Sequence, residues 1–208
     1  MTPDEVATHF TRSDGTYVFA RWGRPIVPVV FGLADETLPI VKGALEAVAT
    51  LTGRPLADAD VELGANLMFF FLRDWRELLA VPGLEEIVPE LATLCPRLEA
   101  QGANQYRLFR FDPQGSIRAA FVFLRMDQAL DAVPAEYLAL AQAVQVILLW
   151  SDRAFATRQL LAWVDGKVML RPGIAGLIRA GYDPILPDQS RDPAHALRLF
   201  ARLNSRQG

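Results

Sequence analysis

A run of apolar residues, Asn66 to Leu72, most constrains the fold of this chain. It consists of Asn-Leu-Met-Phe-Phe-Phe-Leu, so both faces of an extended segment would carry large apolar side chains. Such a strand is stable only where other parts of the protein cover both faces of its sheet. The sequence therefore predicts a central strand here.

Other strands are predicted where β-branched and aromatic residues gather, and helices where apolar residues recur every three to four positions. Pro28 cannot donate a ladder hydrogen bond, so its strand should lie at a sheet edge or contain a bulge. Thr37 and Gly53 suit the two ends of the most regular helix. Asp165-Gly166 suits a turn. The predicted strands are 17–22, 26–31, 66–72, 105–111 and 116–125, and a tight turn at 112–115 joins the last two. The predicted helices are 38–52, 135–149, 172–180 and 193–203. Helical structure is also predicted in short pieces within 74–98, which prolines limit, and in a stretch after 153 that runs through 163.

Composition favours one compact domain over residues 1–208. Of the 208 residues, 51% are hydrophobic, and no low-complexity tract or linker-like run interrupts them. We expect an N-terminal α/β part at about 17–150 and a helical C-terminal part at about 151–204. The formal charge of -3 and the scattered basic residues argue against a nucleic-acid partner.

The cysteine and the apolar segments bear on the compartment. Cys95 is the single cysteine, so no internal disulfide can form. Met1 to Phe10 lacks the pattern of a secretory signal, which makes the chain as given cytoplasmic by default, or an envelope protein if a signal was trimmed. The longest apolar stretch, Tyr137 to Trp150, contains two glutamines and is shorter than the roughly 20 residues that cross a bilayer. We expect a buried helix and no transmembrane segment.

Several short segments resemble the landmarks of a bacterial family. They are Arg21 to Ile26, Thr52-Gly53, Ala65-Asn66, Ile117 with Ala120 and Val122, and Tyr182 to Pro184. Over about Tyr17 to Leu186 the chain resembles the domain-of-unknown-function family 2927, whose members are often described as lipoproteins. The order of predicted elements is also similar to the N-terminal half of zincin-type metalloproteases. The resemblance implies an α+β, zincin-like fold: a mixed sheet, a long helix and a buried helix at the position of the zincin active site.

The residues that would hold zinc in such a helix are replaced. Zincins use two histidines at i and i+4 and an intervening glutamate base. The matching positions are Ala141, which has no ligand atom, and Gln142 and Gln145, which are neutral amides. The two histidines of the chain lie near its opposite ends. We expect His9 to be a terminal residue and His195 a solvated helix position, and we predict no metal, no cofactor and a pseudoenzyme.

Other chemical signatures give no alternative site. The sequence has no Gly-x-Ser-x-Gly elbow, no phosphate loop and no dinucleotide-binding glycine pattern. Cys95 lies among apolar residues and fits a core position better than a nucleophile. The acidic residues Asp58, Asp60 and Glu62 lack the spacing of a calcium loop and are expected on a solvated surface.

The leading hypothesis is a non-catalytic domain that binds a protein or peptide. Zincin-like clefts are bordered by an edge strand that pairs with extended peptide, and we assign that strand to Ser116 to Arg125. Two alternatives remain open: a metal-independent hydrolase that uses carboxylates such as Asp152 and Asp183, and a structural or assembly module. The candidate cleft residues are Gln142, Gln145, Trp150, Asp152, Arg118, Arg179, Tyr182 and Asp183.

Overall fold

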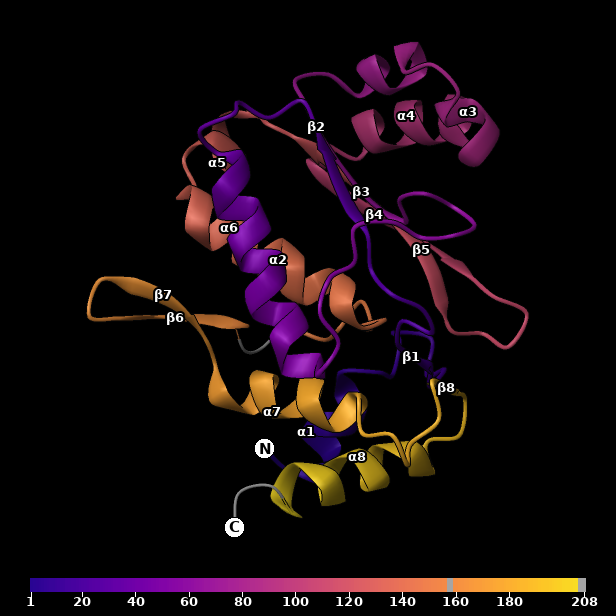
Figure 1. Cartoon of the computed structure of the whole chain (residues 1–208), viewed down its shortest axis with the longest axis vertical. Coiled ribbons are helices and arrows are strands. Elements are labelled where there is room, and N and C mark those ends of the chain that lie inside the picture. Colours follow the sequence, from indigo (N-terminus) through magenta and orange to yellow (C-terminus); the bar gives the residue numbers. More distant parts are fainter. Residues whose placement is uncertain (157–158, 206–208) are drawn as a thin grey trace.

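The computed structural model describes residues 1–156 and 159–205 and has an α+β fold. Its centre is a four-stranded sheet in the order β2-β3-β5-β4 (Figure 1). β2, β3 and β5 run parallel, whereas β4 is antiparallel to β5. The bounds are β2 Pro28–Phe31, β3 Leu67–Leu72, β4 Gln105–Phe111 and β5 Ile117–Arg125.

The prediction for the central strand is confirmed. β3 lies between β2 and β5, and its side chains contribute to two separate apolar clusters. Pro28 lies on β2 at the edge of the sheet, as expected. Gly32, which follows β2, has a φ of 76°, and a Cβ there would lie 2.0 Å from the carbonyl oxygen of Phe71. Only glycine fits at this point of the β2–β3 pairing.

Helices cover both faces of the sheet. On one face lie α2 Leu38–Thr52 and α6 Ala135–Ile147, which pack against each other (Figure 1). The other face is covered by the 3-10 helix η1 Trp75–Ala80 and by α3 Leu84–Ile87 and α4 Leu91–Ala100. Cys95 is buried in this second layer. The short α5 Gln128–Asp131 links β5 to α6.

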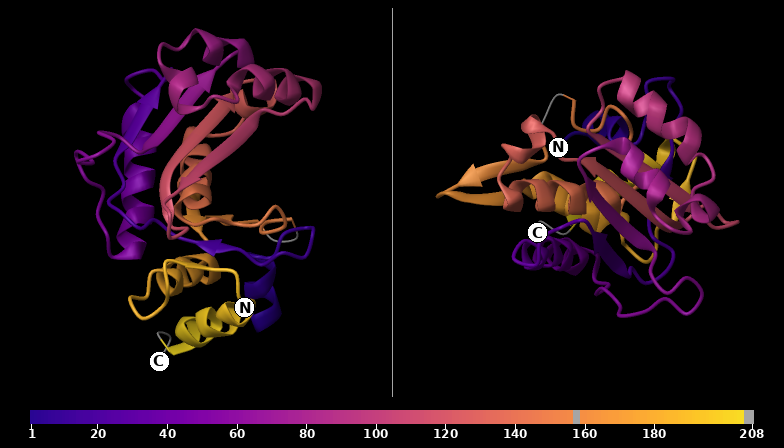
Figure 2. Two further views of the ribbon diagram at one scale, coloured as in Figure 1. Left: turned by 90° about the vertical axis from the view of Figure 1, so that its right-hand side faces the viewer. Right: turned by 90° about the horizontal axis from the view of Figure 1, so that it is seen from above.

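Both ends of the chain form a layer below the sheet (Figure 2). α1 Pro3–Thr8 packs on α8 Ala194–Ser205, and α7 Pro172–Gly181 packs on α8. β1 Phe19–Ala20 pairs with β8 Gln189–Ser190. The buried guanidinium of Arg21 joins these segments, since it donates to Asp188 Oδ1 at 2.6 Å and to the carbonyls of Gly181, Asp183 and Leu186.

Several sequence predictions need correction. The stretch through Trp163 is a hairpin, β6 Leu161–Val164 with β7 Lys167–Leu170, so the C-terminal part is not wholly helical. The expected turn at Asp165-Gly166 joins the two strands, and the predicted stretch also covers residues 157–158, outside the described residues. Only Phe19–Ala20 of the first predicted strand is a strand. Pro96 lies inside α4 instead of limiting it.

The two histidines are also placed differently from the prediction. His9 is only 6% exposed, and its ring lies 5.6 Å from that of Trp150. His195 is 1% exposed, and its Nδ1 lies 2.9 Å from the hydroxyl of Tyr17. Burial lowers the pKa of His195 to about 4. Both rings therefore belong to the packing of the lower layer, neither being a solvated position.

Candidate functional site

The open edge of the main sheet is β4, and the expectation that Ser116 to Arg125 forms it is wrong. β5 lies between β3 and β4 and pairs with both. β4 pairs only with β5, and no other described residue forms a backbone hydrogen bond with Gln105, Arg107 or Phe109. The strand that could accept an extended ligand is therefore Gln105–Phe111.

A partly buried polar cluster connects β4 to α6. Nε2 of Gln142 donates to Oε1 of Gln105 at 2.7 Å, and Nη1 of Arg107 donates to Oε1 of Gln142 at 2.8 Å. Gln142 is 2% exposed, so both ends of its amide are satisfied inside the protein. Arg107 has no ion pair among the described residues, and its burial lowers its pKa to about 10. The guanidinium is still cationic at neutral pH.

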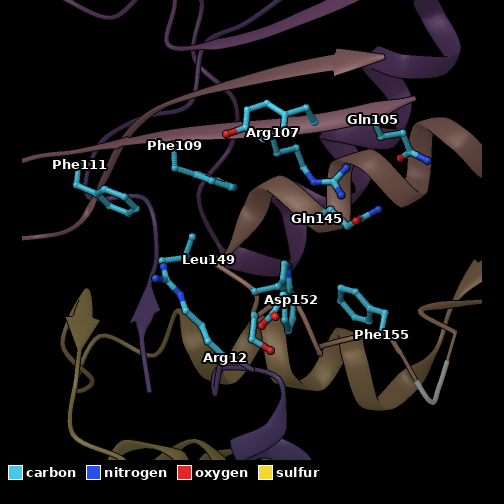
Figure 3. Close-up of a pocket in the computed structure, with 12 residues that line it drawn as sticks. Arg12, Gln105, Arg107, Phe109, Phe111, Gln145, Leu149, Asp152 and Phe155 are labelled. Atoms are coloured by element: carbon cyan, nitrogen blue, oxygen red, sulfur yellow. The ribbon is translucent and has the colours of Figure 1, made fainter. Parts of the chain in front are cut away.

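A cavity of about 450 Å³ lies beside this cluster, between β4 and the segment that follows α6 (Figure 3). We call it the central cleft. Gln105, Arg107 and Phe109 extend into it from β4, and Arg12 and Asp152 line its opposite side. Its lining residues are Arg12, Gln105, Tyr106, Arg107, Phe109, Phe111, Gln145, Leu149, Trp150, Ser151, Asp152 and Phe155.

A second cavity of about 590 Å³ continues from the first. It shares Arg12, Phe111 and Leu149 with the central cleft and extends to the β4–β5 turn at Pro113 and to Arg191. We call the two cavities together the β4 groove. Because the shared residue Phe111 is the last residue of β4, the groove follows the open strand toward the hairpin turn. Its floor includes Phe19 and Ala20 of β1.

The N-terminal segment positions the rim of the central cleft. Phe10 stacks on Trp150, with ring centroids 5.5 Å apart, and Trp150 Nε1 donates to the carbonyl of Val144. Ser151 donates its backbone N–H to His9 O at 2.8 Å. Asp152 accepts from the backbone N–H of Ser13 at 3.0 Å, and hydrogen bonding to Ser13 is the main reason that the pKa of its carboxyl is lowered.

Four of the predicted site residues gather at this cleft. Gln145, Trp150 and Asp152 line it, and Gln142 lies directly behind Gln105 and Arg107. The Gln145 amide donates to the carbonyl of Ala141 in its own helix at 3.2 Å. These residues belong to α6 or to the segment after it, which is where the sequence placed the cleft floor.

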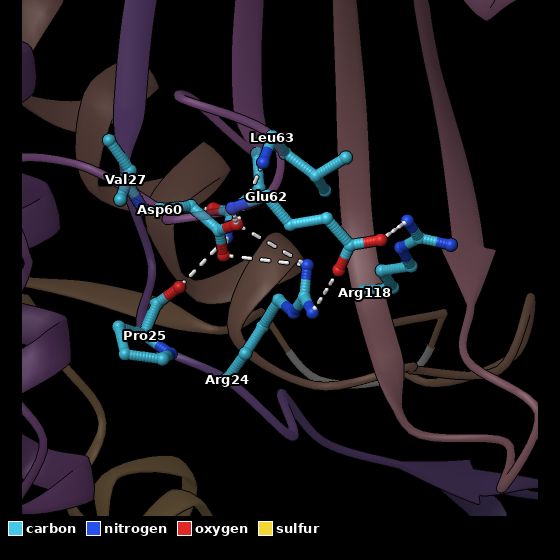
Figure 4. Close-up of polar contacts among 8 residues, drawn as sticks. Arg24, Pro25, Val27, Asp60, Glu62, Leu63 and Arg118 are labelled. Carbon is cyan, nitrogen blue, oxygen red and sulfur yellow. Dashed lines mark hydrogen bonds and ion pairs between the residues drawn. The ribbon is translucent and has the colours of Figure 1, made fainter.

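Arg118 is not at the cleft, because its side chain pairs with Glu62 in the loop before β3 (Figure 4). Glu62 also binds Arg24 at 2.8 Å. The Asp60 carboxylate accepts from the backbone N–H groups of Glu62 and Leu63, both at 2.9 Å, and from the Asn66 amide. This acidic loop is therefore held by protein donors, and within 1–156 and 159–205 no cluster of three metal-ligating side chains occurs.

The other three candidates lie outside the groove. Arg179 is exposed on α7. Tyr182 is buried, and its hydroxyl donates to Ile147 O at 2.8 Å, at the end of α6. Asp183 is 5% exposed and lies 3.7 Å from Arg202 of α8. Asp152 and Asp183 thus do not share a cavity, whereas the hydrolase alternative needs two carboxylates in one pocket.

Gln105, Arg107 and Phe109 were missed as site residues, although the sequence carries a signal for them. The strand Gln105–Phe111 carries three polar or charged residues, Gln105, Arg107 and Arg110, whereas Ala119 to Leu124 is continuously apolar. A continuous apolar run is typical of an interior strand, and charged side chains are typical of an edge strand. This pattern identifies β4 as the open strand.

Comparison with known proteins adds nothing to this site: no family model matches the chain, and no match was found among curated proteins or among solved structures. The chemistry of the groove thus rests on its own residues. No helix within the described ranges is both long and apolar enough to cross a membrane.

Proposed function

We propose that this protein binds an extended polypeptide segment along β4 without cleaving it. The observation that carries the proposal is the unpaired outer edge of β4 beside a groove of matching direction. In β-strand addition, main-chain hydrogen bonds supply affinity and side-chain pockets supply selectivity. Both elements are present here.

The outward groups of β4 follow from its ladder. Arg125 N donates to Asn104 O at 2.8 Å, and hydrogen-bonded pairs alternate along an antiparallel ladder. Tyr106, Leu108 and Arg110 therefore bond to β5, and the backbone groups of Gln105 and Phe109 point away from it. On β5, Ala120 N donates to Asn66 O, on the side away from β4, and this agrees with the alternation. Every second residue of β4 can bond to an added strand.

The dimensions suit a short peptide. β4 has 7 residues. At about 3.4 Å per residue, it could pair with a segment of roughly 6 to 8 residues. Aromatic side chains at Phe109, Trp150 and Phe155 give the central cleft an apolar surface for the ligand's side chains.

The arrangement supports the zincin-like interpretation, with the edge strand reassigned. The antiparallel edge strand β4 lies beside β5, the strand that leads to the buried helix α6. The central cleft separates β4 from the segment after α6. The position of the zincin glutamate base is held by Gln142, whose amide already bonds Gln105 and Arg107. These contacts favour binding over hydrolysis.

Substitution at Phe109 tests the proposal. Phe109→Pro removes an outward N–H without removing a bond to β5, and an edge strand tolerates proline where its N–H faces outward. Phe109→Val is the matched control, because it also removes the ring but keeps the N–H donor. Both variants and the unmodified protein would be panned against a displayed library of random ten-residue peptides.

We expect peptides selected on the unmodified protein to bind Phe109→Val and to lose at least about tenfold in affinity on Phe109→Pro, in line with one or two lost hydrogen bonds. Circular dichroism and thermal unfolding would verify that both variants are folded. Failure to select any peptide, or equal binding to the two variants, would contradict strand addition at β4.

A further inference from the structure

We infer that the β4 groove selects acidic peptides and that Arg107 binds a carboxylate of the ligand. The inference rests on the proposed function and narrows it to one ligand chemistry. It depends on the charges and hydrogen bonds around Arg107 and along the groove.

Arg107 is a cation without a counter-ion among the described residues. Its polar neighbours in the cluster are the neutral amides of Gln105 and Gln142, and its guanidinium has five N–H donors while only the Nη1 bond to Gln142 occurs in this part of the chain. Burying a charge without a partner is costly. A ligand carboxylate in the central cleft would supply the missing negative charge and two further acceptors.

The other charged groups of the groove favour the same ligand. Arg12 and Arg191 also line it, and neither has an ion pair in the described part of the chain. Its two carboxylates each accept a backbone N–H: Asp152 from Ser13 N at 3.0 Å, and Asp112 from Ser116 N at 2.9 Å. Together with Arg107 the groove therefore holds three cations against two carboxylates, and the cations are spread along its length.

The geometry of the strand connects the carboxylate to the peptide. The side chains of Gln105, Arg107 and Phe109 all reach the central cleft, and side chains of an added strand also alternate with a period of two. Residues at every second position of the peptide would therefore face the cleft. Phe109 and Phe155 line the same cavity as Arg107, and apolar surroundings strengthen a charge-assisted hydrogen bond. The expected ligand carries Asp or Glu at one or more alternate positions.

The experiment uses the same random peptide library, panned on the unmodified full chain and on Arg107→Gln. Arg118→Gln is the matched control, because Arg118 lines neither cavity and pairs with Glu62. We expect the unmodified protein and Arg118→Gln to select peptides enriched in Asp and Glu at alternate positions, and Arg107→Gln to lose that enrichment. Replacing the selected acidic residue by its amide should weaken binding to the unmodified protein at least about tenfold.

The possible outcomes separate the inference from the proposed function. Selected peptides that are not acidic, or whose Glu-to-Gln versions bind equally well, overturn the acidic preference but leave strand addition standing. A library that yields no peptide overturns both. Stronger binding to a thymidylate 12-mer than to the selected peptides would assign the arginines to nucleic acid and overturn the inference. The peptide substitutions do not depend on whether Arg107→Gln folds.

Discussion

Oε1 of Gln142 lies 2.8 Å from Nη1 of Arg107, and this bond joins the buried helix to the open strand of the sheet. It fixes the guanidinium at the wall of the central cleft. The same glutamine donates to Gln105 from its other end. One amide therefore sets the positions of two residues of β4.

Gln142→Leu should lower the free energy of unfolding by about 1–3 kcal/mol, because it leaves a donor on Arg107 and an acceptor on Gln105 unsatisfied in a partly buried place. Gln145→Leu is the matched control in the same helix. Among the described residues its amide bonds only the Ala141 carbonyl, so its loss should cost within about 0.5 kcal/mol. Urea unfolding of both variants measures the difference. Equal losses would show that the cluster contributes nothing specific.

His195 should make stability fall between about pH 6.5 and pH 4. Burial lowers its folded pKa to about 4, so the unfolded chain takes up a proton in this range before the folded chain does. The contribution is fully present above the unfolded pKa of about 6.5, and its loss reaches roughly 2 kcal/mol by pH 4.5. Urea unfolding at several pH values measures it. His195→Gln, which keeps an acceptor for Tyr17, should flatten this dependence; an unchanged slope would assign it elsewhere.

Arg21→Lys should destabilise the lower layer by about 3 kcal/mol or more, because an ammonium cannot reproduce a buried guanidinium fork. The fork holds the Gly181 and Leu186 carbonyls and the Asp188 carboxylate. Hydrogen exchange should accelerate first in residues 181–190. As a control, Arg118→Lys alters an exposed ion pair and should change stability by less than about 1 kcal/mol. Uniform acceleration of exchange over the whole chain would contradict this assignment.

Gly32→Ala should cost about 2–4 kcal/mol, the sum of a left-handed backbone and a collision with the Phe71 carbonyl. Gly53→Ala separates the two effects, because Gly53 has a φ of 70° but an added Cβ would meet no atom within 4 Å. It should cost only about 1–2 kcal/mol. Thermal unfolding of the two variants measures the difference in stability. Equal losses of stability would show that the β2–β3 contact adjusts to the added Cβ without strain.

Sequence reasoning located the elements with strong periodicity. The helix between Thr37 and Gly53, the central strand and the hairpin at 112–115 all agree with the structure. It failed at Leu161 to Val164, because a short apolar run has no period that separates helix from strand. Leu161 to Val164 forms a strand because it pairs with Lys167–Leu170 across the turn.

Sequence analysis identified site residues on α6 and in the segment after it, but it did not identify those on β4. Gln142 and Asp152 were identified from their places on and after the buried helix, whereas Arg107 depends on which strand is at the edge. His195 also carried a signal, because Leu199 and Leu203 follow it at four and eight positions and define a buried helix face. Pairing across the chain, as between His195 and Tyr17, has no local signature in the sequence.

The pairing of β1 with β8 determines when the groove becomes complete during synthesis of the chain. Arg21 and Asp188 are 167 residues apart, yet they meet directly beneath the groove whose floor includes Phe19 and Ala20. A nascent chain that has released β4 and β5 from the ribosome already has one wall, but the opposite layer lacks β8 until residues 189–190 emerge. Ligand binding should therefore begin only after residues 189–190 have left the ribosome, so a partner would not bind a shorter nascent chain.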